Sequence, residues 1–192
     1  MLRRGLVGNR WRLVPLVASV SLLMGCGTSV APTGSPNPTL PSPAASVADD
    51  LFSLAEHADR ATYHASDPIG IQAVLTYTGT DTTLVPSGSG EGLVAFGLRQ
   101  LDGPLHMEAA VTADCAQHPM APGIPQAIPF FKSGAYEPTA SDAGFWSQYF
   151  SDPVLRLPPG RWAIIATATI RGRDCASPEH DLTATVEITV EP

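Results

Sequence analysis

The chain has 192 residues, of which 44% are hydrophobic, and its formal net charge at pH 7 is −7. This length suits one domain with a core of its own. The acidic balance disfavours nucleic-acid binding, because phosphate backbones repel a negatively charged surface.

The first 25 residues predict a signal peptide. Residues 1–12 carry four arginines and no acidic residue, and residues 13–24 form the apolar run LVPLVASVSLLM. A basic segment followed by a short apolar one is typical of secretory signals. The run is too short for a permanent transmembrane helix, which needs about 20 apolar residues.

The end of this run resembles the lipobox of bacterial lipoproteins. Leu23-Met24-Gly25-Cys26 has an aliphatic residue, a tolerant position, a small residue and then cysteine. The resemblance implies that Cys26 receives a diacylglyceryl group and becomes the N-terminus after cleavage. Two acyl chains give stable attachment, so we expect a lipid-anchored protein of the cell membrane that faces the extracytoplasmic side. The alternative is a plain signal peptide with an incidental cysteine.

Residues 26–48 predict a disordered tether. After Cys26 the segment is rich in Pro, Ser, Thr and Ala and has no charged side chain. It cannot bury a core, and proline favours extended polyproline II at about 3.1 Å per residue. We expect it to hold a single folded domain, residues 49–192, away from the lipid surface. Cleavage at Cys26 leaves seven basic and 18 acidic residues, a formal charge of −11.

The folded part predicts an all-β protein. Residues 50–60 favour a short helix, because Leu51, Leu54 and Ala55 have the i, i+3, i+4 spacing of an apolar stripe. From residue 68 onward apolar and polar residues alternate with a period of two, which indicates half-buried strands. The predicted strands are 69–77, 92–100, 104–114, 127–131, 154–157, 161–171 and 182–190. Leu101-Asp102-Gly103 is a hairpin signal. Short turns without long helices predict an antiparallel β-sandwich of about seven strands.

One turn resembles those of bacterial immunoglobulin-like domains. Residues 157–164, LPPGRWAI, match the pattern L-x-P-G-x-aromatic-x-aliphatic that leads into a late strand of those domains. Residues 161–171 and 182–190 then resemble their last hairpin. The resemblance implies an immunoglobulin-like sandwich and no particular activity.

Residues 133–153 depart from a minimal sandwich and predict a short helical insertion. Ser141 is the predicted cap of the helix. The aromatic residues at helical spacing are Phe145, Trp146, Tyr149 and Phe150. We expect them to close an edge of the sandwich; the alternative is that part of 116–150 forms a partner surface.

Cys115 and Cys175 predict a structural disulfide. An exported chain meets an oxidising environment, and with Cys26 lipidated an even pair remains. The alternatives are two free thiols or a redox pair, although neither cysteine lies in a C-x-x-C motif.

His106, Met107, His118 and Met120 are the metal candidates. Imidazole and thioether groups suit copper(I), and the spacing resembles that of periplasmic copper chaperones, which also use a β-sandwich and a His-x-Met pair. In a strand, however, His106 and Met107 point to opposite faces, so one of them belongs to the core. The main expectation is therefore that no metal binds, and a copper- or metal-handling lipoprotein is the alternative.

No catalytic motif is found. Residues 87–92, SGSGEG, lack the Lys-Ser/Thr of a P-loop and do not match G-x-S-x-G, so they predict a flexible connector. We expect a protein that is not an enzyme and has no cofactor. Its sandwich would be a binding or structural domain, with an extracytoplasmic protein or glycan as partner and no nucleic acid.

Overall fold

The computed structural model describes residues 42–175 and 180–192. Within them the chain forms eleven strands and one helix. Cys26, the predicted signal peptide and most of the predicted tether lie outside these residues. No helix among the described residues has the length and apolar character that crossing a bilayer requires.

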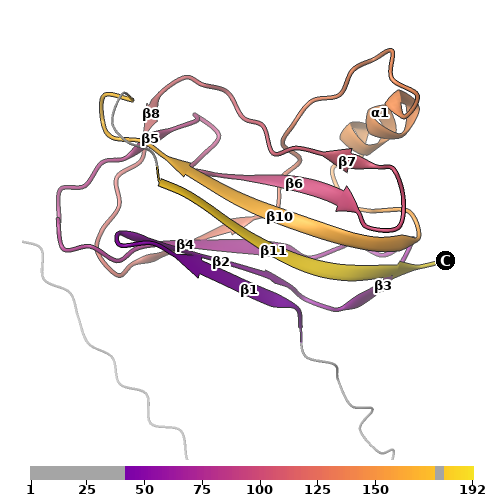
Figure 1. The fold of residues 1–192 in the computed structure, drawn as a ribbon, viewed down its shortest axis with the longest axis horizontal. Helices are drawn as coiled ribbons and strands as arrows, with labels where there is room; N and C mark the ends of the chain where they lie inside the picture. Colours follow the sequence, from indigo (N-terminus) through magenta and orange to yellow (C-terminus); the bar gives the residue numbers. More distant parts are fainter. Residues whose placement is uncertain (1–41, 176–179) are drawn as a thin grey trace, which may run out of the picture. The chain divides into compact units, whose positions relative to one another are not determined.

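Two larger sheets form the layers of a sandwich (Figure 1). The four-stranded sheet has the order β1 (Ala44–Ala48), β2 (Phe52–Ala58), β4 (Ile71–Tyr77) and β9 (Pro125–Pro129). The five-stranded sheet has the order β3 (Thr62–His64), β11 (His180–Glu191), β10 (Gly160–Ile170), β6 (Val94–Gln100) and β7 (His106–Met107). A separate pair consists of β5 (Ser87–Gly88) and β8 (Ala116–Gln117). Neighbours are antiparallel except β3, which runs parallel to β11.

The strand order has an immunoglobulin-like arrangement. The orders β2-β4-β9 and β6-β10-β11 correspond to the A-B-E and C-F-G orders of such sandwiches, with β1 added outside β2. The prediction of an all-β sandwich with a short helical insertion is confirmed. The described strands number eleven rather than about seven, because β1 is added and four further strands have only two or three residues.

The core lies between the two sheets and follows the predicted alternation. Its members on β4, β10 and β11 are Ile71, Ala73, Leu75, Tyr77, Trp162, Ile164, Ala166, Ala168, Ile170, Leu182, Ala184, Val186, Ile188 and Val190. Each fully buried large aliphatic side chain contributes about 1.5–3 kcal/mol, so this interleaved layer is a main source of stability. The indole N–H of Trp162 donates to the carbonyl of Pro158 at 3.0 Å, which anchors the predicted turn to the core.

The N-terminal part of the domain corrects two predictions. Residues 52–58 form β2 rather than part of a helix, and residues 44–48, assigned to the tether, form β1. Both strands pair along their whole length, and β2 also pairs with β4. The helical spacing in 50–60 was ambiguous because alternate residues of the same segment are buried. Pairing on both sides of β2 outweighed local helix propensity.

Other boundaries also differ. Residues 154–157 form no strand, although Leu155 and Leu157 are buried and the carbonyl of Leu155 accepts from the N–H of Ile69. The predicted strand 104–114 is reduced to β7, because the chain leaves the sheet after Met107. The hairpin before it is confirmed by the bond from the N–H of Gln100 to the carbonyl of Leu105.

The predicted helix is α1 (Ala143–Ser151), which in Figure 1 lies beyond β7, away from β5 and β8. Its cap is Asp142 rather than Ser141, and the Asp142 carboxylate accepts from the indole N–H of Trp146. Trp146 and Tyr149 are buried. Phe145 and Phe150 are half-buried and contact them edge to face. The aromatic residues therefore pack on one another and on the core, as the edge-closing interpretation predicts.

Candidate functional site

The disulfide between Cys115 and Cys175 defines one end of the sandwich. It joins the segment after β7 to the segment after β10, with 6.0 Å between the two Cα atoms. Both cysteines have positive φ, 54° and 57°. This left-handed region is sparsely populated by residues other than glycine and costs on the order of 1 kcal/mol or more for each. The bond thus holds two strained backbone positions together.

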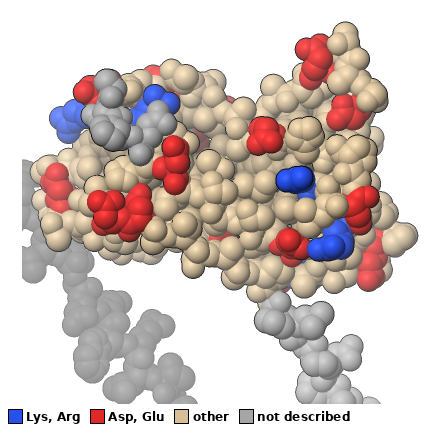
Figure 2. All heavy atoms as spheres, viewed as in Figure 1, with Lys and Arg blue, Asp and Glu red and all other residues tan. Residues whose placement is uncertain are grey.

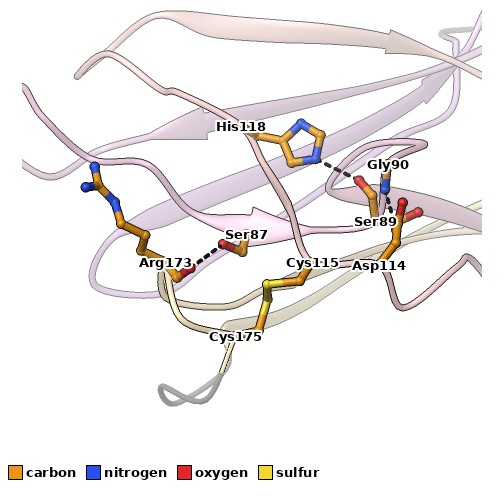
Figure 3. The surroundings of a disulfide bond; sticks show 8 residues. All are labelled: Ser87, Ser89, Gly90, Asp114, Cys115, His118, Arg173 and Cys175. Atoms are coloured by element: carbon orange, nitrogen blue, oxygen red, sulfur yellow. Dashed lines mark hydrogen bonds between the residues drawn. A yellow bond between two sulfur atoms is a disulfide. The ribbon is translucent and has the colours of Figure 1, made fainter.

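A network of hydrogen bonds surrounds the disulfide (Figure 3). The hydroxyl of Ser87 donates to the carbonyl of Arg173, and the backbones of Ser87 and Arg171 exchange two further bonds of 2.8 and 3.0 Å. A ring N–H of His118 donates to the carbonyl of Ser89 at 2.7 Å. Ser87 and Ser89 are buried. The network links three segments that are far apart in the sequence.

Asp114 extends this hydrogen-bond network to Gly90 and Thr112. Its carboxylate accepts from the backbone N–H of Gly90 at 2.7 Å and from the hydroxyl of Thr112 at 2.9 Å. The Gly90 N–H, followed by the Thr112 hydroxyl, lowers the pKa of Asp114. A Cβ at Gly90 would lie 2.5 Å from a carboxylate oxygen of Asp114, so a side chain at position 90 would displace this carboxylate.

Residues 87–92 are therefore not the flexible connector that the sequence predicted. Ser87 and Gly88 pair with β8 on one side, and Ser87 pairs with Arg171 on the other. The available signal was the alternation of serine with glycine. Small hydroxyl side chains can be buried when they find local acceptors, and glycine permits close approach of another chain segment.

Two cavities flank the disulfide end. The smaller has a volume of about 280 Å³, and both cysteines line it together with Thr167 and Thr169 of β10. The larger has a volume of about 560 Å³ and lies where β2 begins and β10 ends. Its lining is Leu51, Phe52, Asp81, Thr83, Leu84, Val85, Pro86, Ile170, Arg171, Gly172, Arg173 and His180. Arg171 lines both cavities.

The four metal candidates of the sequence are not brought together. His106 is exposed and Met107 is buried on β7, beside the Leu98–Arg99 end of β6. His118 instead contacts Ser89, which precedes the other end of β6, and Met120 is buried. The expectation that one member of the His106–Met107 pair belongs to the core is confirmed. The two pairs lie toward opposite ends of β6 and do not form one coordination site.

A different group of possible metal ligands consists of Asp49, Asp50 and His180, whose ligand atoms lie within 4.8 Å of one another. Burial alone would raise the pKa of Asp49. Hydrogen bonds from the N–H groups of Leu51 and Phe52, together with the His180 ring 2.8 Å away, instead hold it below its ordinary value. The Asp49 carboxylate thus accepts hydrogen bonds within the β1–β2 turn. We therefore assign no metal site to Asp49, Asp50 and His180.

Glu56 is the unexpected titratable group, and it lies away from the disulfide. It sits at an inward position of β2 with 0% of its surface exposed, and neither carboxylate oxygen has a hydrogen-bond partner of ordinary geometry. Burial raises its pKa to about 8, while the nearby backbone of Ala166 and Val186 lowers it less. Glu56 is therefore largely protonated at pH 7.

These features define a disulfide-linked β-sandwich with a cavity-bearing end. A comparison of the chain with protein-family models, curated proteins and solved structures finds no match.

Proposed function

We propose that the chain is a lipid-anchored envelope or cell-surface protein whose sandwich is a non-catalytic binding domain, with its binding site at the disulfide end. The observation that carries the proposal is the bond between Cys115 and Cys175 beside two cavities. Disulfides persist in oxidising compartments outside the cytoplasm, which fits an exported protein. Loops at the ends of a rigid sandwich are common places for recognition.

The tether length supports the anchored arrangement. The lipobox-like cysteine is at position 26, and β1 begins at Ala44. Residues 27–43, if extended as polyproline II, would reach about 50 Å. Such a spacing would leave the domain free to meet a ligand away from the lipid surface.

The hydrogen bonds at the disulfide end support binding rather than catalysis. A nucleophilic serine needs a histidine or another base within hydrogen-bond reach of its hydroxyl. The hydroxyl of Ser87 instead donates to a carbonyl, and that of Ser89 pairs with Thr112 at 3.0 Å. His118 contacts the backbone of Ser89 and not its hydroxyl.

The charge distribution fits a soluble surface without a nucleic-acid site. Acidic side chains are scattered over the face in Figure 2, with few basic ones between them. A scattered negative surface would repel phosphate backbones. Any anionic ligand would therefore need a local group of cations.

The anchor is tested by expressing the full chain in a bacterial host with a palmitate analogue and separating membrane from soluble fractions. The wild-type chain should carry the label and sediment with membranes, whereas Cys26→Ser should lose both properties. Thr28→Ala, just past the lipobox, is the matched control and should behave like the wild type. Unchanged membrane attachment of Cys26→Ser would overturn the proposed anchor.

A further inference from the structure

The outer edge of β1 is an unpaired strand edge. β1 is an end strand of the four-stranded sheet, and no other described segment bonds to its outer side (Figure 1). The N–H of Asp49 donates to the carbonyl of Phe52, and alternate residues of an antiparallel strand bond to the same neighbour. Odd-numbered positions therefore face β2. The N–H and C=O groups that point outward belong to Ala44, Ser46 and Ala48.

The other long edges of the two large sheets carry features that hinder pairing with a further strand. β9 begins and ends with proline at outward positions, and proline has no N–H to donate. On β6, the hydroxyl of Ser133 accepts from the N–H of Phe96 and donates to its carbonyl. The part of β11 beyond β3 has Asp181 and Glu187 at its ends, so self-pairing would oppose like charges. The sequence of β1, AASVA, has neither proline nor a charged residue.

β1 is complementary to a second copy of itself. If two copies run antiparallel about a two-fold axis at Ser46, Ser46 faces Ser46 and Ala44 faces Ala48 of the other copy. Each of these pairs joins residues whose N–H and C=O groups point outward, so every outward group of the strand gains a bond. On the inner face, Ala45 would meet Val47 of the other copy. Both are half-buried against the core, and pairing would cover part of their remaining apolar surface.

The charged residues near β1 do not oppose one another in this register. Asp49 would face Pro43 of the other copy, and Asp50 would face Ser42. This matters because the chain after position 25 has a formal charge of −11, and two such surfaces repel each other. The residues of β1 are uncharged, and those that face outward are small and exposed. A second copy can therefore pair with this edge without opposing acidic groups along the strand.

We propose that β1 pairs with β1 of a second copy of this chain, which joins two four-stranded sheets into one continuous antiparallel sheet. The two-fold axis passes Ser46, and both copies contribute the same residues to the contact, as in most protein dimers. Backbone hydrogen bonds supply the attraction, and the register supplies the specificity. The inference goes beyond the proposed function and requires neither the lipid anchor nor a binding site at the disulfide end.

The register is tested by disulfide cross-linking of the full chain carrying Cys26→Ser, so that an introduced cysteine is the only free thiol. Facing residues of a bonded antiparallel pair have Cα atoms about 5.5 Å apart, which a disulfide can bridge. Ser46→Cys should therefore give a covalent dimer on a non-reducing gel after mild oxidation. Ala44→Cys and Ala48→Cys are the matched controls. Each cysteine there would lie about 13 Å along the strand from its counterpart, too far for a bond.

Self-association without a cross-link is measured by sedimentation equilibrium of the same Cys26→Ser parent over a range of concentrations. Ser46→Pro removes an outward N–H but no bond to β2, so it should weaken dimerisation by about tenfold or more. Ala127→Pro makes the same change at an outward position of β9 and should leave dimerisation unchanged. Thermal unfolding of each variant, compared with the parent, shows that it is folded.

Equal cross-linking of the three cysteine variants, or none in Ser46→Cys, would overturn the inference, because the pairing has one register. A parent that stays monomeric at every concentration, or unchanged self-association of folded Ser46→Pro, would overturn it as well. If Ser46→Pro does not fold, the pattern of cross-links decides the question. None of these results bears on lipidation of Cys26, which the palmitate label measures separately.

Discussion

Glu56 and the disulfide end both bury polar groups, but they do so in different ways. At the disulfide end the buried hydroxyls of Ser87 and Ser89 each have a partner. Glu56 is equally inaccessible, and neither of its carboxylate oxygens has a hydrogen-bond partner. An unpartnered carboxylate is costly in an apolar interior, so the group retains a proton instead. The same sandwich therefore buries polar groups in two ways: hydrogen bonds satisfy the serine hydroxyls, and protonation neutralises Glu56.

The surroundings of Glu56 show how the carboxyl group is accommodated. Its register partners on β1 and β4 are Ala45 and Ala73, and Ala166 of the opposite sheet lies close to it. In that opposite sheet Ala166 is paired with Ala184. Small side chains leave volume for the longer glutamate without offering it a hydrogen bond. This layer of the core is filled by a side chain that is mostly protonated at neutral pH.

The largest expected effect comes from opening the disulfide. Reduction of the Cys115–Cys175 bond, or Cys175→Ser in a Cys26→Ser background, should lower the free energy of unfolding by about 4 kcal/mol in the chain-entropy model for a loop of this length. Relief of the left-handed cysteine backbones would reduce this loss. Urea unfolding with and without reductant measures it. Identical midpoints would show that the hydrogen-bond network holds this end without the bond.

The next effect, measured for a change of one pH unit, is a pH dependence caused by Glu56. The pKa of Glu56 is about 8 in the folded state, and the ordinary pKa of a glutamate is 4.5, so between these pH values the folded state binds a proton that the unfolded state has released. Stability should therefore fall as pH rises from about 4.5 to 8, by up to about 1.4 kcal/mol per pH unit at the steepest.

Glu56→Gln should remove most of this slope, because the amide is neutral at every pH in the range. Glu187→Gln, an exposed change on β11, is the control and should retain the slope. Urea unfolding at several pH values measures both. A wild-type stability that does not change between pH 5 and pH 8 would mean that Glu56 gains a partner in solution.

The smallest effect concerns one bond at the disulfide end. Ser87→Ala removes the hydroxyl that donates to the carbonyl of Arg173 and should cost about 1 kcal/mol. Ser147→Ala, an exposed change on α1, should have little effect. Urea unfolding measures both variants. An unchanged free energy of unfolding in Ser87→Ala would contradict the expected contribution of this bond.

Individual elements show why some predictions succeeded. The alternation in β10 and β11 is unambiguous, since every second residue from Trp162 to Ile170 and from Leu182 to Val190 is apolar and buried. In the segment that forms β2, the apolar residues also match the i, i+3, i+4 spacing of a helix. A glutamate at an inward position also hid the alternation, because a charged residue is normally assigned to the wet face. The flanking strands resolved what local sequence could not.

Sequence alone was sufficient to predict the all-β class, the helical insertion and the pairing of Cys115 with Cys175, because periodicity and cysteine parity are local or countable properties. Tertiary structure decided the rest. Phe52, Leu84 and Ile170 line one cavity although they come from three distant segments. The burial of Glu56 likewise depends on alanines in neighbouring strands of both sheets. Cavities and pKa shifts arise from the packing of distant segments, and the order of residues along one strand does not contain that information.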